Sequence, residues 1–116
     1  MENLEIKKEI VTKSGKRMTI SSLLRMLYGL NDTDIEIYLT LKEMKNATIK
    51  DIIDKTHKNK PTVIRSLKIL ETLGFVSKEK LRSGEKGRPI YRYYLNTKIE
   101  KMIISDLKEI IESLNA

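Results

Sequence analysis

The side chains of this sequence best suited to binding chemistry are basic, and they gather in one part of the chain. Residues 55–92 contain eleven Lys or Arg and three Asp or Glu, whereas residues 1–54 contain nine of each. A surface built only for solubility mixes both signs, so this excess predicts a polyanionic partner. Nucleic acid fits best, and an acidic protein or a membrane surface is the alternative.

The densest basic segment is KLRSGEKGRPIYRYYL, residues 80–95. Its glycines permit the tight turns of a hairpin tip, and Pro89 restricts the approach to a second strand. Lys86-Gly87-Arg88-Pro89 is similar to the core of an AT-hook, whose arginine enters a narrow minor groove. The segment predicts a loop that contacts the minor groove or phosphates through Lys80, Arg82, Lys86, Gly87, Arg88 and Arg92. A solvated hairpin tip is the alternative.

A second basic group lies on a helix predicted for residues 60–73, which begins near Pro61 and ends at Gly74. Three apolar residues at i, i+4 and i+7 form its core-facing stripe: Val63, Leu67 and Leu70. The other residues face outward, where the planar guanidinium of Arg65 suits a guanine edge and lysines suit phosphates. The predicted contacts are Lys58, Asn59, Lys60, Pro61, Thr62, Ile64, Arg65 and Lys68. A solvated helix face is the alternative.

The remaining elements follow from periodicity and capping signals. Residues 19–28 predict a helix that stops at Gly29. Three capping boxes predict helix starts, at Thr33-x-x-Glu36, Thr48-x-x-Asp51 and Thr97-x-x-Glu100. The first of these helices covers roughly residues 33–45. The second runs from Thr48 to near Thr56, and the third runs from Thr97 to about residue 114. Residues 75–81 and 90–95 alternate with period two and predict an antiparallel hairpin. Residues 2–12 are weakly amphipathic and fit a helix or half of a hairpin.

The order of these elements is that of a winged helix-turn-helix, in which residues 60–73 are expected as the recognition helix in the major groove and residues 81–89 as the wing on the minor groove or backbone. The stretch LYGLNDTDIEIYLTLKEMKNATIKDIIDKTHKNKPTVIRSLKILETLGFVSKEK resembles the winged-helix domain of archaeal and bacterial TrmB-type regulators. Its portion TVIRSLKILETLGFV is also similar to MarR-type repressors, and the most specific part is Leu67-x-x-Leu70-x-x-x-Gly74-Phe75-Val76, which leads from helix to strand. The resemblance covers roughly residues 20–96 and implies sequence-specific binding of double-stranded DNA as a dimer, in transcriptional control. Many TrmB-type proteins carry a large C-terminal sugar-binding domain. This sequence ends soon after the wing, so we do not expect a sugar effector.

The terminal helix carries an apolar seam whose members step by four, three and four residues, a spacing typical of coiled coils. We expect it to pack partly against a second chain, together with the N-terminal segment. The predicted interface residues are Leu23, Leu27, Ile99, Ile103, Leu107, Ile110 and Leu114. A two-fold dimer places two recognition helices about one DNA turn apart and predicts a pseudo-palindromic site. Packing within one chain is the alternative.

Enzymatic and membrane functions find little support in the sequence. His57 is the only histidine, there is no cysteine, and no phosphate-binding G-x-x-x-x-G-K-[ST] motif occurs. No cofactor or metal is expected, and no secretory signal or membrane span is predicted, so a cytoplasmic location is expected. A small-molecule effector in a dimer cleft, as in MarR-type proteins, stays open, and no residue identifies one.

The predicted fold is mostly α with a small β-hairpin (α+β): a winged helix-turn-helix flanked by dimerisation helices. Residues 1–18 form an N-terminal extension, expected as a helix with a dimer contact. Residues 19–96 form the DNA-binding domain, and residues 97–116 form the C-terminal dimerisation helix. Two other functions stay open, namely an architectural DNA-binding protein with little sequence preference and a winged helix that binds another protein.

Overall fold

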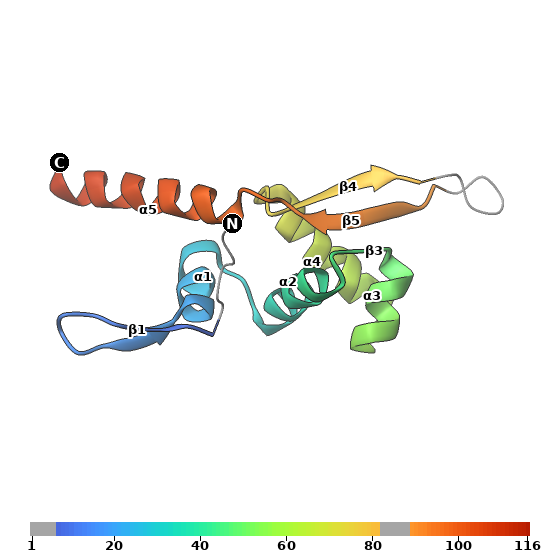
Figure 1. Cartoon of the computed structure of the whole chain (residues 1–116), viewed down its shortest axis with the longest axis horizontal. Coiled ribbons are helices and arrows are strands. Elements are labelled where there is room, and N and C mark those ends of the chain that lie inside the picture. Colours follow the sequence, from blue (N-terminus) through green and yellow to red (C-terminus); the bar gives the residue numbers. More distant parts are fainter. Residues whose placement is uncertain (1–6, 82–88) are drawn as a thin grey trace.

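A computed structural model describes residues 7–81 and 89–116. Its helices are α1 (Ile20–Tyr28), α2 (Asp32–Met44), α3 (Ile49–Thr56), α4 (Lys60–Thr72) and α5 (Ile99–Asn115). Its strands are β1 (Glu9–Val11), β2 (Arg17–Thr19), β3 (Asn46–Ala47), β4 (Val76–Lys80) and β5 (Tyr91–Leu95). The molecule measures 57 × 27 × 27 Å, with the β1–β2 hairpin and the β4–β5 hairpin toward opposite ends of the long axis (Figure 1). This mixed arrangement confirms the predicted winged helix-turn-helix.

The core lies where α2, α3 and α4 meet one face of a small sheet. Its largest fully buried side chains include Leu24, Ile37, Leu41, Ile52, Leu67, Leu70 and Phe75. The sheet has the order β3–β5–β4 with antiparallel pairing throughout. The expected strands around residues 75–81 and 90–95 are therefore confirmed as β4 and β5. The two-residue strand β3 was not predicted, because two residues are too few to show a period.

Residues 9–19 form a hairpin, which is one of the two alternatives left open for residues 2–12, and not the helix expected for the N-terminal extension. β1 pairs antiparallel with β2, with Ile10 opposite Met18. Gly15 at the tip has φ +88°, which glycine adopts without steric strain. The backbone N–H of Gly15 donates to the carbonyl of Thr12, and Thr12 N–H donates to the carbonyl of Lys16. The Ser14-Gly15 break therefore makes a turn between strands, and strand pairing decides between the two alternatives that the sequence pattern left open.

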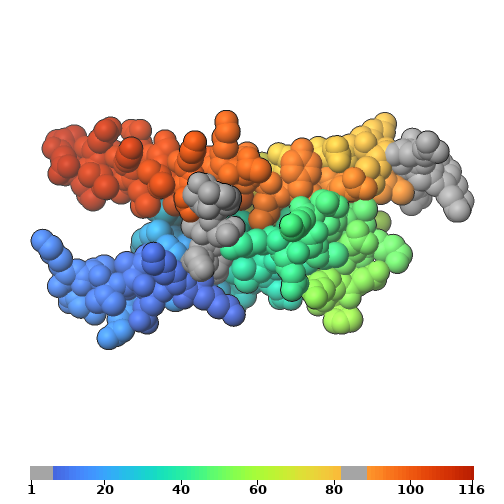
Figure 2. All heavy atoms as spheres, in the orientation of Figure 1, coloured from blue at the N-terminus to red at the C-terminus, as the bar shows by residue number. Residues whose placement is uncertain are grey.

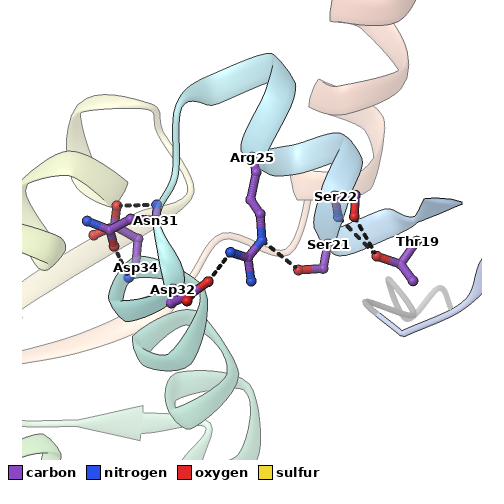
Figure 3. Close-up of polar contacts among 7 residues, drawn as sticks. All are labelled: Thr19, Ser21, Ser22, Arg25, Asn31, Asp32 and Asp34. Atoms are coloured by element: carbon purple, nitrogen blue, oxygen red, sulfur yellow. Dashed lines mark hydrogen bonds and ion pairs between the residues drawn. The ribbon is translucent and has the colours of Figure 1, made fainter.

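Two of the three predicted capping boxes need correction. The box at Thr48 is confirmed, since its hydroxyl accepts from Asp51 N–H and the Asp51 side chain accepts in return. At α2, however, the box is Asn31-x-x-Asp34, two residues before the predicted position (Figure 3). At α5 no side chain caps the first turn. Three-residue spacing of capping residues recurs by chance in polar sequence, and only the backbone decides which pair lies at a helix start.

Helix α4 ends in a Schellman motif. Phe75 N–H donates to the carbonyl of Leu70 and Gly74 N–H to that of Glu71, while Gly74 adopts φ +84°. A β-carbon at Gly74 would come within 3.1 Å of the methyl group of Met102 on α5. Gly74 thus ends α4, as predicted, and also lets α5 approach closely.

Among the described residues, no helix is both long and apolar enough to cross a bilayer. Within the same part of the chain, no group of three acidic or histidine side chains is arranged to hold a metal ion.

Candidate nucleic-acid interface

Helix α4 has a buried face and a basic face. Val63, Ser66, Leu67 and Leu70 are buried, and Lys60, Pro61, Ile64, Arg65 and Lys68 are exposed. Ile64, at 42% exposure, is a large apolar side chain left at the surface between lysines and an arginine. The helix therefore presents one long charged flank with an apolar residue in its middle, as the sequence predicts.

The start of α4 is organised by Asn59. Its side-chain oxygen accepts from Thr62 N–H at 2.9 Å, and so provides an acceptor for one of the backbone N–H groups that have no partner within the helix. Pro61 follows in the first turn, where its missing N–H leaves no hydrogen bond unmade. His57, two residues before Asn59, adopts φ +60° and is the C-cap residue of α3. The polar segment between α3 and α4 is thus a tight turn that presents the first turn of α4 to solvent.

Three cations of α4 have no ion-pair partner in the described part of the chain. Lys60, Arg65 and Lys68 form no ion pair with any residue that the structure describes. Lys58 differs from them, because its ammonium lies 3.1 Å from Glu36 of α2 and its side chain is only 24% exposed. A cation already neutralised gains less from a phosphate, so the candidate interface centres on Lys60, Arg65 and Lys68.

The base of the wing is ordered by strand pairing. Leu81 N–H donates to the carbonyl of Ile90 at 2.7 Å, which closes the described end of the β4–β5 hairpin. Lys80 is exposed, and Arg92 lies 3.6 Å from Glu79 of the paired strand. The predicted wing residues Arg82, Lys86, Gly87 and Arg88 lie outside the described residues.

A cleft separates α3 from the base of the wing. It has a volume of about 440 Å³ and a mostly apolar lining. The lining residues are Thr48, Ile49, Lys50, Ile53, Lys60, Pro89, Ile90 and Tyr91. Sequence reasoning missed this hollow, because two segments some thirty residues apart meet only in the fold.

A buried carboxyl group links α4 to α2. The hydroxyl of Ser66 donates to Oδ1 of Asp34 at 2.5 Å, and both residues are buried. The other Asp34 oxygen accepts from Asn31 N–H at 3.0 Å, as part of the α2 capping box (Figure 3). One side chain thus caps α2 and holds the buried face of the recognition helix. Its signal in the sequence is Asn31-x-x-Asp34, which the neighbouring Thr33-x-x-Glu36 pattern obscured.

The predicted dimer residues differ in burial: some are buried, some half-buried and some exposed. Ile99 and Ile103 are buried in the core of their own chain, so this part of the expected interface packs within one protomer. Leu23, Leu27 and Leu107 are half-buried. Further along α5, Ile104, Ile110, Ile111 and Leu114 are exposed, and Leu114 reaches 80%. The first turns of α5 complete the domain, whereas the later turns have an uncovered apolar side.

Tyr28 joins α5 to α1. Its hydroxyl donates to Asp106 of α5, and its ring packs edge-on against Phe75 with centroids 5.1 Å apart. Burial, and then the hydrogen bond and charge of Asp106, raise the pKa of Tyr28 above its ordinary value. Burial also raises the pKa of Tyr38 in α2 to about 12. Both hydroxyls stay protonated at neutral pH, and that of Tyr28 is a hydrogen-bond donor.

Residues 24–97 match the model of the family described as "Sugar-specific transcriptional regulator TrmB". The chain belongs to the TrmB family. The matched region runs from α1 through β5 and includes the whole α4 face and the base of the wing. The β1–β2 hairpin and the whole of α5 lie outside the TrmB match.

Individual relatives extend the TrmB comparison. An uncharacterized protein from Methanocaldococcus jannaschii is 26% identical over 88% of this chain and 81% of its own. A possible transcriptional regulator from Methanosarcina mazei Go1 has a TM-score of 0.74 at 15% identity, over 94% of this chain and 96% of its own. The archaeal chromatin protein TrmBL2 has a TM-score of 0.59 at 21% identity, over 81% of this chain and 34% of its own. Both structures share the fold.

Proposed function

We propose that this TrmB-family chain is a transcriptional regulator that binds a pseudo-palindromic double-stranded DNA site as a dimer. In the proposed complex, α4 enters the major groove and the wing, residues 81–89, contacts the minor groove or the backbone. The observation that carries the proposal is the exposed cationic flank of α4, where Lys60, Arg65 and Lys68 have no acidic partner among the described residues. Clustered like charges repel one another, and a polyanion relieves that repulsion.

The proposed roles follow from side-chain chemistry. Arg65 reads a base edge, because its guanidinium can donate two parallel hydrogen bonds to O6 and N7 of guanine. Ile64, exposed beside it, suits the methyl group of thymine. Lys60 and Lys68 contact phosphates, which position the helix without reading sequence. Lys58 contributes less, because Glu36 already neutralises it.

We expect Arg65→Ala to weaken binding to the preferred site by about 1–3 kcal/mol and to relax the base preference at one position of each half-site. The measurement is selection of binding sites from a random duplex pool at physiological salt, followed by titration of the selected site. Lys68→Ala is the matched variant on the same flank, and it should weaken all duplexes about equally. If both variants lowered affinity without altering the selected sequence, Arg65 would not read a base.

The proposed dimer uses the exposed apolar side of α5. We expect Ile110→Ser with Leu114→Ser to convert a dimer into a monomer, because these side chains lie past the part of α5 that packs in the core. Sedimentation over a range of concentrations measures the change. Glu109→Ser with Glu112→Ser, on exposed positions of the same turns, is the control. A wild-type chain that stays monomeric at tens of micromolar contradicts the proposal.

The second candidate is an architectural DNA-binding protein with little sequence preference. The fold similarity to TrmBL2, an archaeal chromatin protein, favours it, although the match spans only 34% of that protein. Here affinity comes from phosphates, so the log–log salt slope, about 0.9 per contact, is nearly equal on every duplex. Site selection distinguishes the two functions. A single inverted repeat supports the operator-reading regulator, and the absence of a consensus supports the architectural protein.

A further inference from the structure

The β1–β2 hairpin carries a second basic cluster, separate from α4 and the wing. Residues 7–19 contain five basic side chains and one acidic side chain. The basic residues are Lys7, Lys8, Lys13, Lys16 and Arg17, all of them exposed. The even balance over residues 1–54 conceals this cluster, because the acidic residues that offset it lie mainly on α2 and α3.

The hairpin is an ordered element. Three residue pairs align its strands, and Ile20 N–H donates to the carbonyl of Lys8, which ties the hairpin to the first turn of α1. At the tip, the Thr12 hydroxyl accepts from Lys16 N–H at 3.1 Å and bonds to the Ser14 hydroxyl at 3.0 Å. The tip lysines are therefore displayed from a turn with its own hydrogen bonds.

Only one of these charges is neutralised by a described residue. Arg17 lies 3.0 Å from Glu9 on the paired strand. The four lysines form no ion pair within the described part of the chain. The six preceding residues, which include Glu2 and Glu5, are not described. Lys13 and Lys16 flank the tip, so they are the lysines that an extended partner reaches first.

The position of the hairpin separates it from the α4 surface of the same chain. Figure 1 places β1 and the described end of the β4–β5 hairpin toward opposite ends of a molecule 57 Å long. In the space-filling view, the blue hairpin projects at the edge of the molecule, away from α3 (Figure 2). The hairpin is therefore separate from the described base of the wing, at the other end of the long axis.

We propose that the β1–β2 hairpin is a second binding surface for the phosphate backbone of nucleic acid. The surface carries charge but few groups suited to reading bases, since its strands are short and lysines present point charges to phosphates. The phosphates can come from either of two sources. One is DNA that flanks the selected site on the same duplex, and the other is a second, separate duplex. The hairpin proposal rests on the proposed DNA-binding function. Its test distinguishes failure of the hairpin proposal from failure of DNA binding through α4.

The test compares Lys13→Gln/Lys16→Gln with wild type on a duplex limited to the selected site and on one extended by about two helical turns. Loss of two phosphate contacts lowers the log–log salt slope by about 1.8 and weakens binding on the order of 10-fold. An effect confined to the extended duplex assigns the hairpin to flanking DNA. If the variant no longer holds a labelled duplex to a tethered duplex while wild type does, the hairpin binds a second duplex. Either result supports the proposal.

Lys101→Gln/Lys108→Gln, an equal charge change on exposed positions of α5, is the matched control. Thermal unfolding of each variant checks that the fold is intact. If the hairpin variant binds and bridges every duplex as wild type does, while Arg65→Ala loses affinity, the hairpin proposal is overturned and the α4 proposal stands. If wild type binds no duplex, both are overturned.

Discussion

Leu67→Ala is expected to lower the free energy of unfolding by about 2–5 kcal/mol. Leu67 is 2% exposed and lies on the inward face of α4, in the core that joins α4 to α2 and the sheet. Truncation removes buried apolar surface and leaves a cavity that the surrounding helices fill only partly. Since domains of this size are stable by roughly 5–15 kcal/mol, the loss is a large fraction of the total.

Denaturant titration followed by circular dichroism measures this change. Ile64→Ala is the matched control, because Ile64 lies on the outward face of the same helix at 42% exposure. It should change stability by well under 1 kcal/mol. The two variants should also separate in DNA binding, since Ile64→Ala removes a proposed base contact from a folded protein. Equal destabilisation by both variants would contradict the assigned orientation of α4.

Asp34→Ala is expected to destabilise the protein by about 2–4 kcal/mol, which combines a lost helix cap with an unpaired buried hydroxyl. Asp34 accepts from Ser66 of α4 at 2.5 Å and from Asn31 N–H at 3.0 Å, away from solvent. Its removal leaves the Ser66 hydroxyl without this acceptor in the core. The variant should also bind DNA more weakly than its residual stability explains, because the recognition helix loses its polar attachment to α2.

A double-mutant cycle with Ser66→Ala isolates the contact. Asp34→Ala should cost less in the Ser66→Ala background than in wild type, by about 0.5–3 kcal/mol. Asp32→Ala is the control two residues away. Asp32 pairs with Arg25 at the exposed surface (Figure 3), and such pairs contribute about 0–1 kcal/mol. Additive effects of Asp34→Ala and Ser66→Ala would show that the two side chains act independently.

Much of the fold follows from local patterns in the sequence. The stripe of Val63, Leu67 and Leu70 determined which face of α4 is buried, and Gly74 determined where the helix ends. Thr48 with Asp51 placed the start of α3 correctly. These predictions hold because periodicity, capping and glycine conformation are properties of a few neighbouring residues, and tertiary contacts reinforced them.

Other features were decided only by tertiary structure. Whether residues 9–19 form a helix or a hairpin depended on strand pairing, which the weak amphipathic pattern left open. Ile103 and Ile110 belong to one seam in the sequence, yet the structure buries the first in its own core and leaves the second exposed. The Asp34–Ser66 contact joins residues 32 positions apart, and the cleft beside the wing joins α3 to β5. The sequence alone determined the basic face of α4, because charge and period are local. The buried contact that holds α4 joins Asp34 to Ser66, which only the folded chain brings together, and the pairing of β1 with β2 decided how the basic residues of 7–19 are displayed.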